Sequence, residues 1–134
     1  MADVVIVPAI ILGLIIGFIE LLFVHADQSF SGSHWFGHGI HAAIFSIIFV
    51  FINMNVAYVL GLINVNIPFQ EVAVQGLVAL AAFIKIQGAS AGAGKAVREK
   101  LWHTIVIVAL ITATPYIWPF LKPLCDGLIG GSLC

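Results

Sequence analysis

The sequence predicts an all-α integral membrane protein, a single domain over residues 1–134 with four transmembrane helices arranged as two antiparallel hairpins in a small bundle. Hydrophobic residues occupy 62% of the 134 positions and charged residues only 8%, whereas about a quarter of residues are charged in soluble proteins. A helix that crosses a bilayer needs about 20 mainly apolar residues. Four stretches meet this requirement: 4–26, 34–62, 69–87 and 100–121.

The first two stretches carry small and amide side chains that suggest contact with other helices. The first contains Gly13-x-x-x-Gly17, a spacing that lets another helix approach closely. We expect it to be a retained helix rather than a cleaved signal, because the residues before it include no Lys or Arg and the apolar run is too long. The second begins after Ser33, a good N-cap, and carries Asn53 and Asn55. Because amides need partners in hydrocarbon, these two residues predict a surface that faces protein.

The third and fourth stretches also carry polar groups with expected roles. Gln75 is expected to face a neighbouring helix, whereas Lys85 can reach the membrane interface. In the fourth stretch Pro115 lacks a backbone N–H and is expected to kink or end the helix. Thr112 and Thr114 can then donate hydrogen bonds to the freed carbonyls.

The distribution of basic residues predicts the orientation. Four of the five Lys and Arg side chains lie at or between the ends of the third and fourth stretches: Lys85, Lys95, Arg98 and Lys100. Such loops favour the cytoplasmic side, which puts the C-terminus outside the cell or cytoplasmic membrane. Cys125 and Cys134 flank a glycine-rich segment, and an outside location would permit a disulfide between them. A free or lipidated cysteine at the membrane surface is the alternative.

Four of the five histidines lie within residues 25–42, where the first stretch ends and the second begins. His34, His38 and His41 are spaced i, i+4 and i+7, which places them on one helical face. If the two helices fold back between residues 30 and 31, residues whose numbers sum to 61 lie at equal depth, so Glu20 pairs with His41. A carboxylate inside a bilayer costs several kcal/mol unless it is paired, protonated or hydrated.

This clustering predicts a candidate site for a divalent transition metal, Zn, Fe or Cu, because imidazole and carboxylate are its usual ligands. The candidate ligands are Glu20, His25, Asp27, His34, His38 and His41. A structural hydrogen-bonded hairpin and a proton-relay or haem role are alternatives. The spacing His34-x-x-x-His38-x-x-His41 also resembles the first histidine box of membrane di-iron desaturases and hydroxylases. That family has several further boxes, and this chain has five histidines in all.

The size of the chain favours a structural or accessory subunit of a homo-oligomer or larger membrane complex, since four helices in 134 residues leave little room for a catalytic chamber. The contacts are expected through Gly13, Gly17, Asn53, Asn55 and Gln75. Membrane lipid is an expected partner, and the net charge of −1 argues against nucleic acid. The alternatives are a metal-dependent oxidoreductase, hydrolase or metal carrier, and an oligomeric proton or ion channel lined by Glu20 and the histidines.

Overall fold

The computed structural model describes residues 4–26, 35–92, 100–131 and 134. Within these residues the chain forms helices and no strand, which confirms the all-α prediction. The helices are α1 (Val7–Ala26), α2 (Trp35–Met54), α3 (Val56–Leu62), α4 (Gln70–Gly92) and α5 (Leu101–Ile129).

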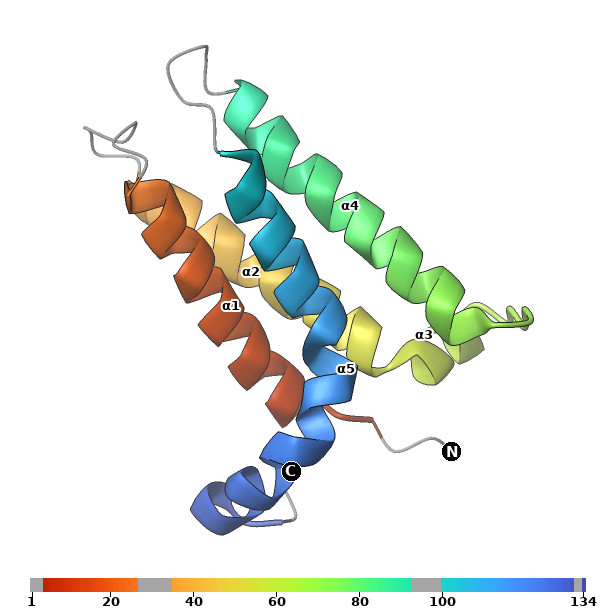
Figure 1. Cartoon of the computed structure of the whole chain (residues 1–134). Helices are drawn as coiled ribbons and strands as arrows, with labels where there is room; N and C mark the ends of the chain where they lie inside the picture. Colours follow the sequence, from red (N-terminus) through yellow and green to blue (C-terminus); the bar gives the residue numbers. More distant parts are fainter. Residues whose placement is uncertain (1–3, 27–34, 93–99, 132–133) are drawn as a thin grey trace.

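The helices are arranged as two antiparallel pairs, α1 with α2 and α4 with α5 (Figure 1). The central contact joins α2 to α5, and each of these two helices also packs on α1 and on α4. No contact joins α1 to α4 among the described residues.

The closest helix contact lies at Gly13 and Gly17 of α1. A Cβ atom added at Gly13 would lie 2.5 Å from the Cα of Ile47, and one added at Gly17 would lie 2.7 Å from the Cα of Ala43. The Gly-x-x-x-Gly segment is therefore a true packing face, and its partner is α2 of the same chain. The numbers of each facing pair add up to 60, one less than the sum predicted from the hairpin.

Where the sequence predicts one helix over 34–62, the structure has α2 and α3, which meet at a bend of 91°. The bend lies at Asn55, whose side chain is buried. Its Nδ2 donates to the carbonyl oxygens of Phe51 (2.9 Å) and Val5 (3.1 Å), and its Oδ1 accepts from the Val5 amide (2.7 Å). An amide side chain that bonds the backbone in this way competes with the regular helix, which explains the break.

The last helix continues through Pro115, Pro119 and Pro123 to Ile129, eight residues beyond the predicted end at 121. Pro115 cannot donate to the carbonyl of Ile111 four residues earlier. That oxygen instead accepts from Asn53 Nδ2 of α2 (2.8 Å) and from Thr114 Oγ1 (2.7 Å). The helix therefore survives the proline because other donors replace the missing amide, as predicted for Thr114.

The chain end is tied back to α5 by a disulfide. Cys125 lies in the last turns of α5 and is bonded to Cys134, with 6.0 Å between their Cα atoms. Of the states that the sequence leaves open for these cysteines, the structure has the disulfide.

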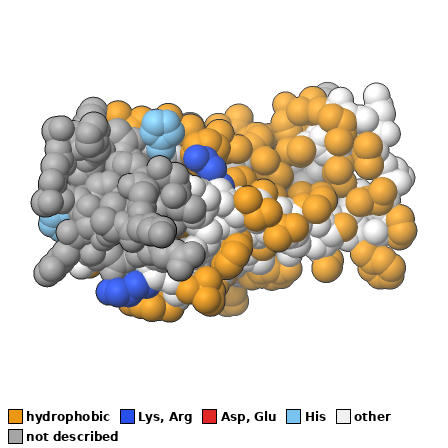
Figure 2. Space-filling model, turned by 90° about the horizontal axis from the view of Figure 1, so that it is seen from above, with side chains coloured by type: hydrophobic (Ala, Val, Ile, Leu, Met, Phe, Trp, Pro, Cys, Tyr) orange, Lys and Arg blue, Asp and Glu red, His pale blue; other side chains and the backbone are white. Residues whose placement is uncertain are grey.

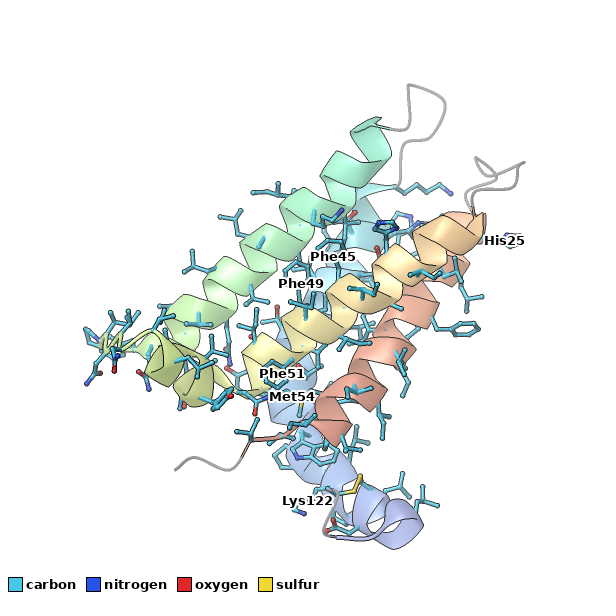
Figure 3. The ribbon with its side chains drawn as sticks, turned by 180° about the vertical axis from the view of Figure 1, so that it is seen from behind. His25, Phe45, Phe49, Phe51, Met54 and Lys122 are labelled. Carbon is cyan, nitrogen blue, oxygen red and sulfur yellow. A yellow bond between two sulfur atoms is a disulfide. The ribbon has the colours of Figure 1, made fainter. Side chains whose placement is uncertain are left out.

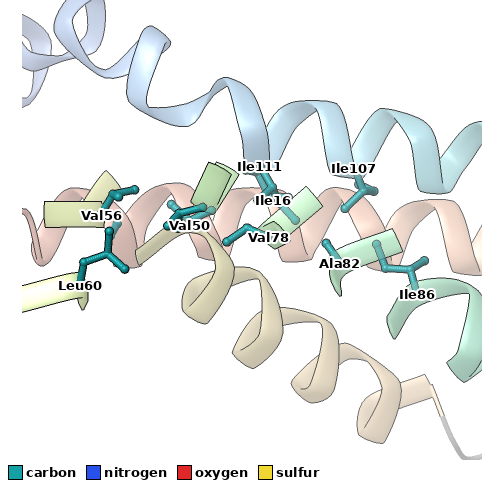
Figure 4. Packing of buried hydrophobic residues seen from close by; sticks show 11 residues of the cluster. Ile16, Val50, Val56, Leu60, Val78, Ala82, Ile86, Ile107 and Ile111 are labelled. Carbon is teal, nitrogen blue, oxygen red and sulfur yellow. The ribbon is translucent and has the colours of Figure 1, made fainter. Parts of the chain in front are cut away.

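Aliphatic side chains from all five helices form the core, and those of Ile16, Val50, Val78, Ile107 and Ile111 meet in its middle (Figure 4). Other large apolar side chains cover the outside, including Phe18 on α1, Leu77 on α4 and Phe120 on α5. Three described helices, α1, α4 and α5, are long and apolar enough to cross a membrane, and α2 with α3 makes a fourth if the bent pair counts as one span.

Candidate functional site

Two charged side chains, Glu20 of α1 and Lys85 of α4, lie inside the apolar part of the bundle, on either side of α2. Glu20 Oε2 accepts a hydrogen bond from Oγ of the buried Ser46 at 3.4 Å, and the positive charge of Lys85 attracts this carboxylate. The Lys85 ammonium lies 4.2 Å from the ring centre of Phe45. Phe45 projects from α2 in Figure 3. Charge and ring attract one another in this geometry.

Glu20 and Lys85 lie at similar depths. Glu20 is six residues before the end of α1, and Lys85 is seven residues before the end of α4. With a rise of 1.5 Å per residue, each lies about 10 Å from the end of its own helix, and both of these helix ends are at the same end of the bundle. Carboxylate and ammonium groups are rare at such a depth in membrane helices, and they usually serve a function or pair with one another.

A second group of polar side chains lies nearer that end, between α1, α4 and α5. Gln87 Nε2 donates to Oγ1 of the buried Thr104 at 2.6 Å. The buried ring of His103 stacks on Phe23 of α1 at 4.4 Å and meets Trp102 edge to face at 3.8 Å. His103, which the spacing alone leaves isolated at the start of the fourth stretch, thus becomes part of the packed interior.

Figure 2 shows Lys and His side chains at this end of the molecule, whereas hydrophobic side chains and backbone make up most of the rest of that view. Polar contacts recur at the opposite end, where Tyr116 Oη donates to Gln75 Oε1 at 2.7 Å. Gln75 thus faces α5, as predicted. Between the two ends lies the aliphatic layer around Ile16, Val50 and Ile107.

The six predicted metal ligands are only partly described. The structure places Glu20 between α1 and α2 with Ser46 as a partner, whereas the side chains of His25 and His41 are exposed. Asp27, His34 and the His38 side chain lie outside the described residues. Among the described side chains, no group of three His, Cys, Asp or Glu residues could hold a metal ion. The metal site of all six residues stays a prediction.

The sequence interpretation missed Ser46, Gln87 and Thr104. Ser46 lies inside an otherwise apolar stretch, Gln87 is the last residue of the predicted third stretch, and Thr104 lies three residues after the start of α5. A polar side chain among apolar ones needs a partner, so its place in the sequence is the one signal that could have indicated these contacts.

The outer surface carries a small apolar groove of about 120 Å³ between α1 and α5. Its lining includes Leu12, Ile15 and Ile19 from α1, with Leu110, Thr114 and Ile117 from α5. The Thr114 hydroxyl already donates to Ile111, so this groove suits an apolar partner. No family model, curated protein or solved structure matches the chain.

Proposed function

We propose that this chain is an integral membrane protein with spans α1, α2 plus α3, α4 and α5, and that it serves as a structural or accessory subunit of a homo-oligomer. The length and apolar character of α1, α4 and α5 support the membrane location. So do the large apolar side chains on their outer surfaces, which lipid would cover.

The Cys125–Cys134 disulfide supports a C-terminus outside the membrane, because disulfides persist in oxidising compartments. The basic residues between α4 and α5 support the same orientation, since they favour the cytoplasmic side. These two features lie at opposite ends of α5, so a single orientation satisfies both.

The apolar layer across the middle of the bundle is the observation that carries the proposed role. Ile16, Val50, Val78, Ile107 and Ile111 fill the space between the helices and separate the polar groups at the two ends. An apolar constriction of this kind keeps water and ions out of a pore. A bundle with a filled centre acts through its surface, which favours a packing role over transport through one chain.

The residues predicted to join subunits are already used inside the chain: Gly13 and Gly17 against α2, Asn53 and Gln75 against α5, and Asn55 against Val5. Contact between subunits therefore requires another surface. The groove between α1 and α5 is the best candidate, because its aliphatic lining can accept the exposed apolar side chains of α1 from a second copy.

We expect the purified protein in lipid nanodiscs to have a native mass of at least two chains of 14.3 kDa each. Ile15→Trp, which places a larger side chain in the groove, is expected to weaken assembly about tenfold, a change of about 1.4 kcal/mol. Leu77→Trp changes an exposed α4 residue outside the groove and serves as the control. Native mass spectrometry over a range of protein-to-lipid ratios measures both. A wild-type monomer at every ratio, or equal effects of the two variants, would contradict the proposal.

A proton or ion pathway is the second candidate, because Glu20, Ser46 and Lys85 bring two charged groups and a hydroxyl together about 10 Å inside the bundle. In this case liposomes that contain the protein should dissipate a pH gradient faster than empty liposomes. Glu20→Gln should reduce that rate about tenfold or more, whereas the exposed Glu71→Gln should leave it unchanged. Flux equal to that of empty liposomes, or unaffected by Glu20→Gln, would remove this candidate.

A further inference from the structure

The last turns of α5 extend past the rest of the bundle. With 29 residues α5 is about 43 Å long, whereas the hydrocarbon core of a bilayer is about 30 Å thick and the 20 residues of α1 match it. The end of α5 lies beyond the first turn of α1 and is turned away from the axis of the bundle (Figure 1). Prolines at 115, 119 and 123 account for this change of direction, since each disturbs the helix.

This terminal segment, residues 120–129, has two different faces. Phe120, Leu124 and Leu128 follow one another at i, i+4 and i+8 and are 84%, 62% and 75% exposed. Lys122 and Asp126 form an ion pair of 3.1 Å on another side of the helix. At 100° per residue the two sets point in roughly opposite directions. The segment is therefore amphipathic, and its polar face carries no net charge.

The chain end does not cover the apolar face. The disulfide ties Cys134 to Cys125, and a Cβ atom added at Gly131 would lie 3.6 Å from Asp126 Oδ1. Gly131 thus lies on the side of the helix that carries the ion pair. Phe120, Leu124 and Leu128 remain exposed, and they continue the exposed apolar surface of α5 that includes Tyr116.

We propose that residues 120–129 form an interfacial helix that lies along the outer membrane surface, with Phe120, Leu124 and Leu128 inserted below the lipid head groups. Amphipathic helices of this kind place their apolar face about 5–10 Å into the boundary between head groups and acyl chains. The neutral polar face points to water, so the contact uses apolar lipid rather than anionic head groups and does not depend on salt. This inference rests on the membrane location in the proposed function.

Tryptophan quenching in phosphatidylcholine vesicles tests the proposal on the full-length chain. Each reporter variant is made in a chain whose own three tryptophans are replaced by phenylalanine: Trp35→Phe, Trp102→Phe and Trp118→Phe. Leu124→Trp then reports on the apolar face and Lys122→Trp on the polar face. Because the apolar face is expected to lie about 5–10 Å below the surface, lipids brominated in the acyl chain should quench the Leu124→Trp fluorescence about threefold more than that of Lys122→Trp. Acrylamide in the water should quench Lys122→Trp more than Leu124→Trp.

Leu14→Trp lies at an exposed position in the middle of α1. This variant distinguishes failure of the interfacial helix from failure of the membrane location. If brominated lipid quenches Leu14→Trp but quenches the two α5 reporters equally, the interfacial helix is wrong while the membrane location stands. Absence of lipid quenching at all three positions would show that the chain is not inserted, and the proposed function would fail with it. Unequal quenching of the α5 reporters that vanishes in 1 M salt, where the Debye length is about 3 Å, would also contradict the neutral contact.

Discussion

Replacement of Gly13 by alanine should destabilise the bundle more than any other single methyl addition in α1. The new Cβ would lie 2.5 Å from the Cα and 2.8 Å from the backbone nitrogen of Ile47. Backbone atoms cannot rotate away, so α1 and α2 must separate along their whole contact. Overpacking of this kind costs about 1–3 kcal/mol even where side chains can adjust. We expect a loss at the upper end of that range, measured as the free energy of unfolding in bicelles.

Gly76→Ala is the matched control for Gly13→Ala. Gly76 also lies inside a helix, α4, but a Cβ atom added there meets nothing within 4 Å. Alanine has a higher helix propensity than glycine by up to about 1 kcal/mol, so this variant should be as stable as the wild type or more so. Equal unfolding free energies for the two variants would show that α1 and α2 do not pack as closely as described.

The pairing of α1 with α2 could be predicted because its determinants lie in the sequence itself. The Gly13 and Gly17 spacing marks a face where helices approach closely, and the short connection between the first two stretches fixes their relative height. The structure pairs these residues with Ile47 and Ala43, within one residue of the predicted register. Local pattern was sufficient here since the two helices are neighbours in the chain.

The break at Asn55 and the full length of α5 could not be predicted in the same way. Asn55 bonds the backbone of Val5, and Asn53 bonds the carbonyl that Pro115 leaves free. These partners lie 50 and 58 residues away in the sequence. A hydropathy pattern cannot show which distant carbonyl an amide will meet, so it cannot tell whether Asn55 interrupts a helix or Pro115 ends one.

The candidate site was predicted in part. Glu20 was recognised because an acid inside an apolar run is costly, whereas Lys85 was expected to reach the interface. The structure places Lys85 over Phe45, about as far from the end of α4 as Glu20 is from the end of α1, and its reach to the interface stays a prediction. The rotation of α4 about its axis brings Lys85 to Phe45, and sequence alone does not determine that rotation, because both the buried and the exposed sides of α4 are apolar.

Asn55→Leu should loosen both the start of α1 and the bend between α2 and α3. The substitution removes a donor and an acceptor from Val5 and a second donor from the Phe51 carbonyl. Each buried backbone group that loses its partner costs about 1–3 kcal/mol. Water near the membrane surface can replace some of the lost hydrogen bonds, so we expect the free energy of unfolding to fall by about 2 kcal/mol.

Hydrogen exchange at the Val5 amide gives a direct readout of the same contact, because this N–H donates to Asn55 Oδ1 at 2.7 Å. A loss of about 2 kcal/mol corresponds to exchange roughly thirtyfold faster in Asn55→Leu, at 1.4 kcal/mol for each factor of ten. Asn66→Leu changes an exposed asparagine in the turn before α4 and should leave the Val5 amide unchanged. If the Val5 amide exchanges equally fast in the wild type and in Asn55→Leu, the Asn55 side chain does not hold the start of α1, and the bend must have another cause.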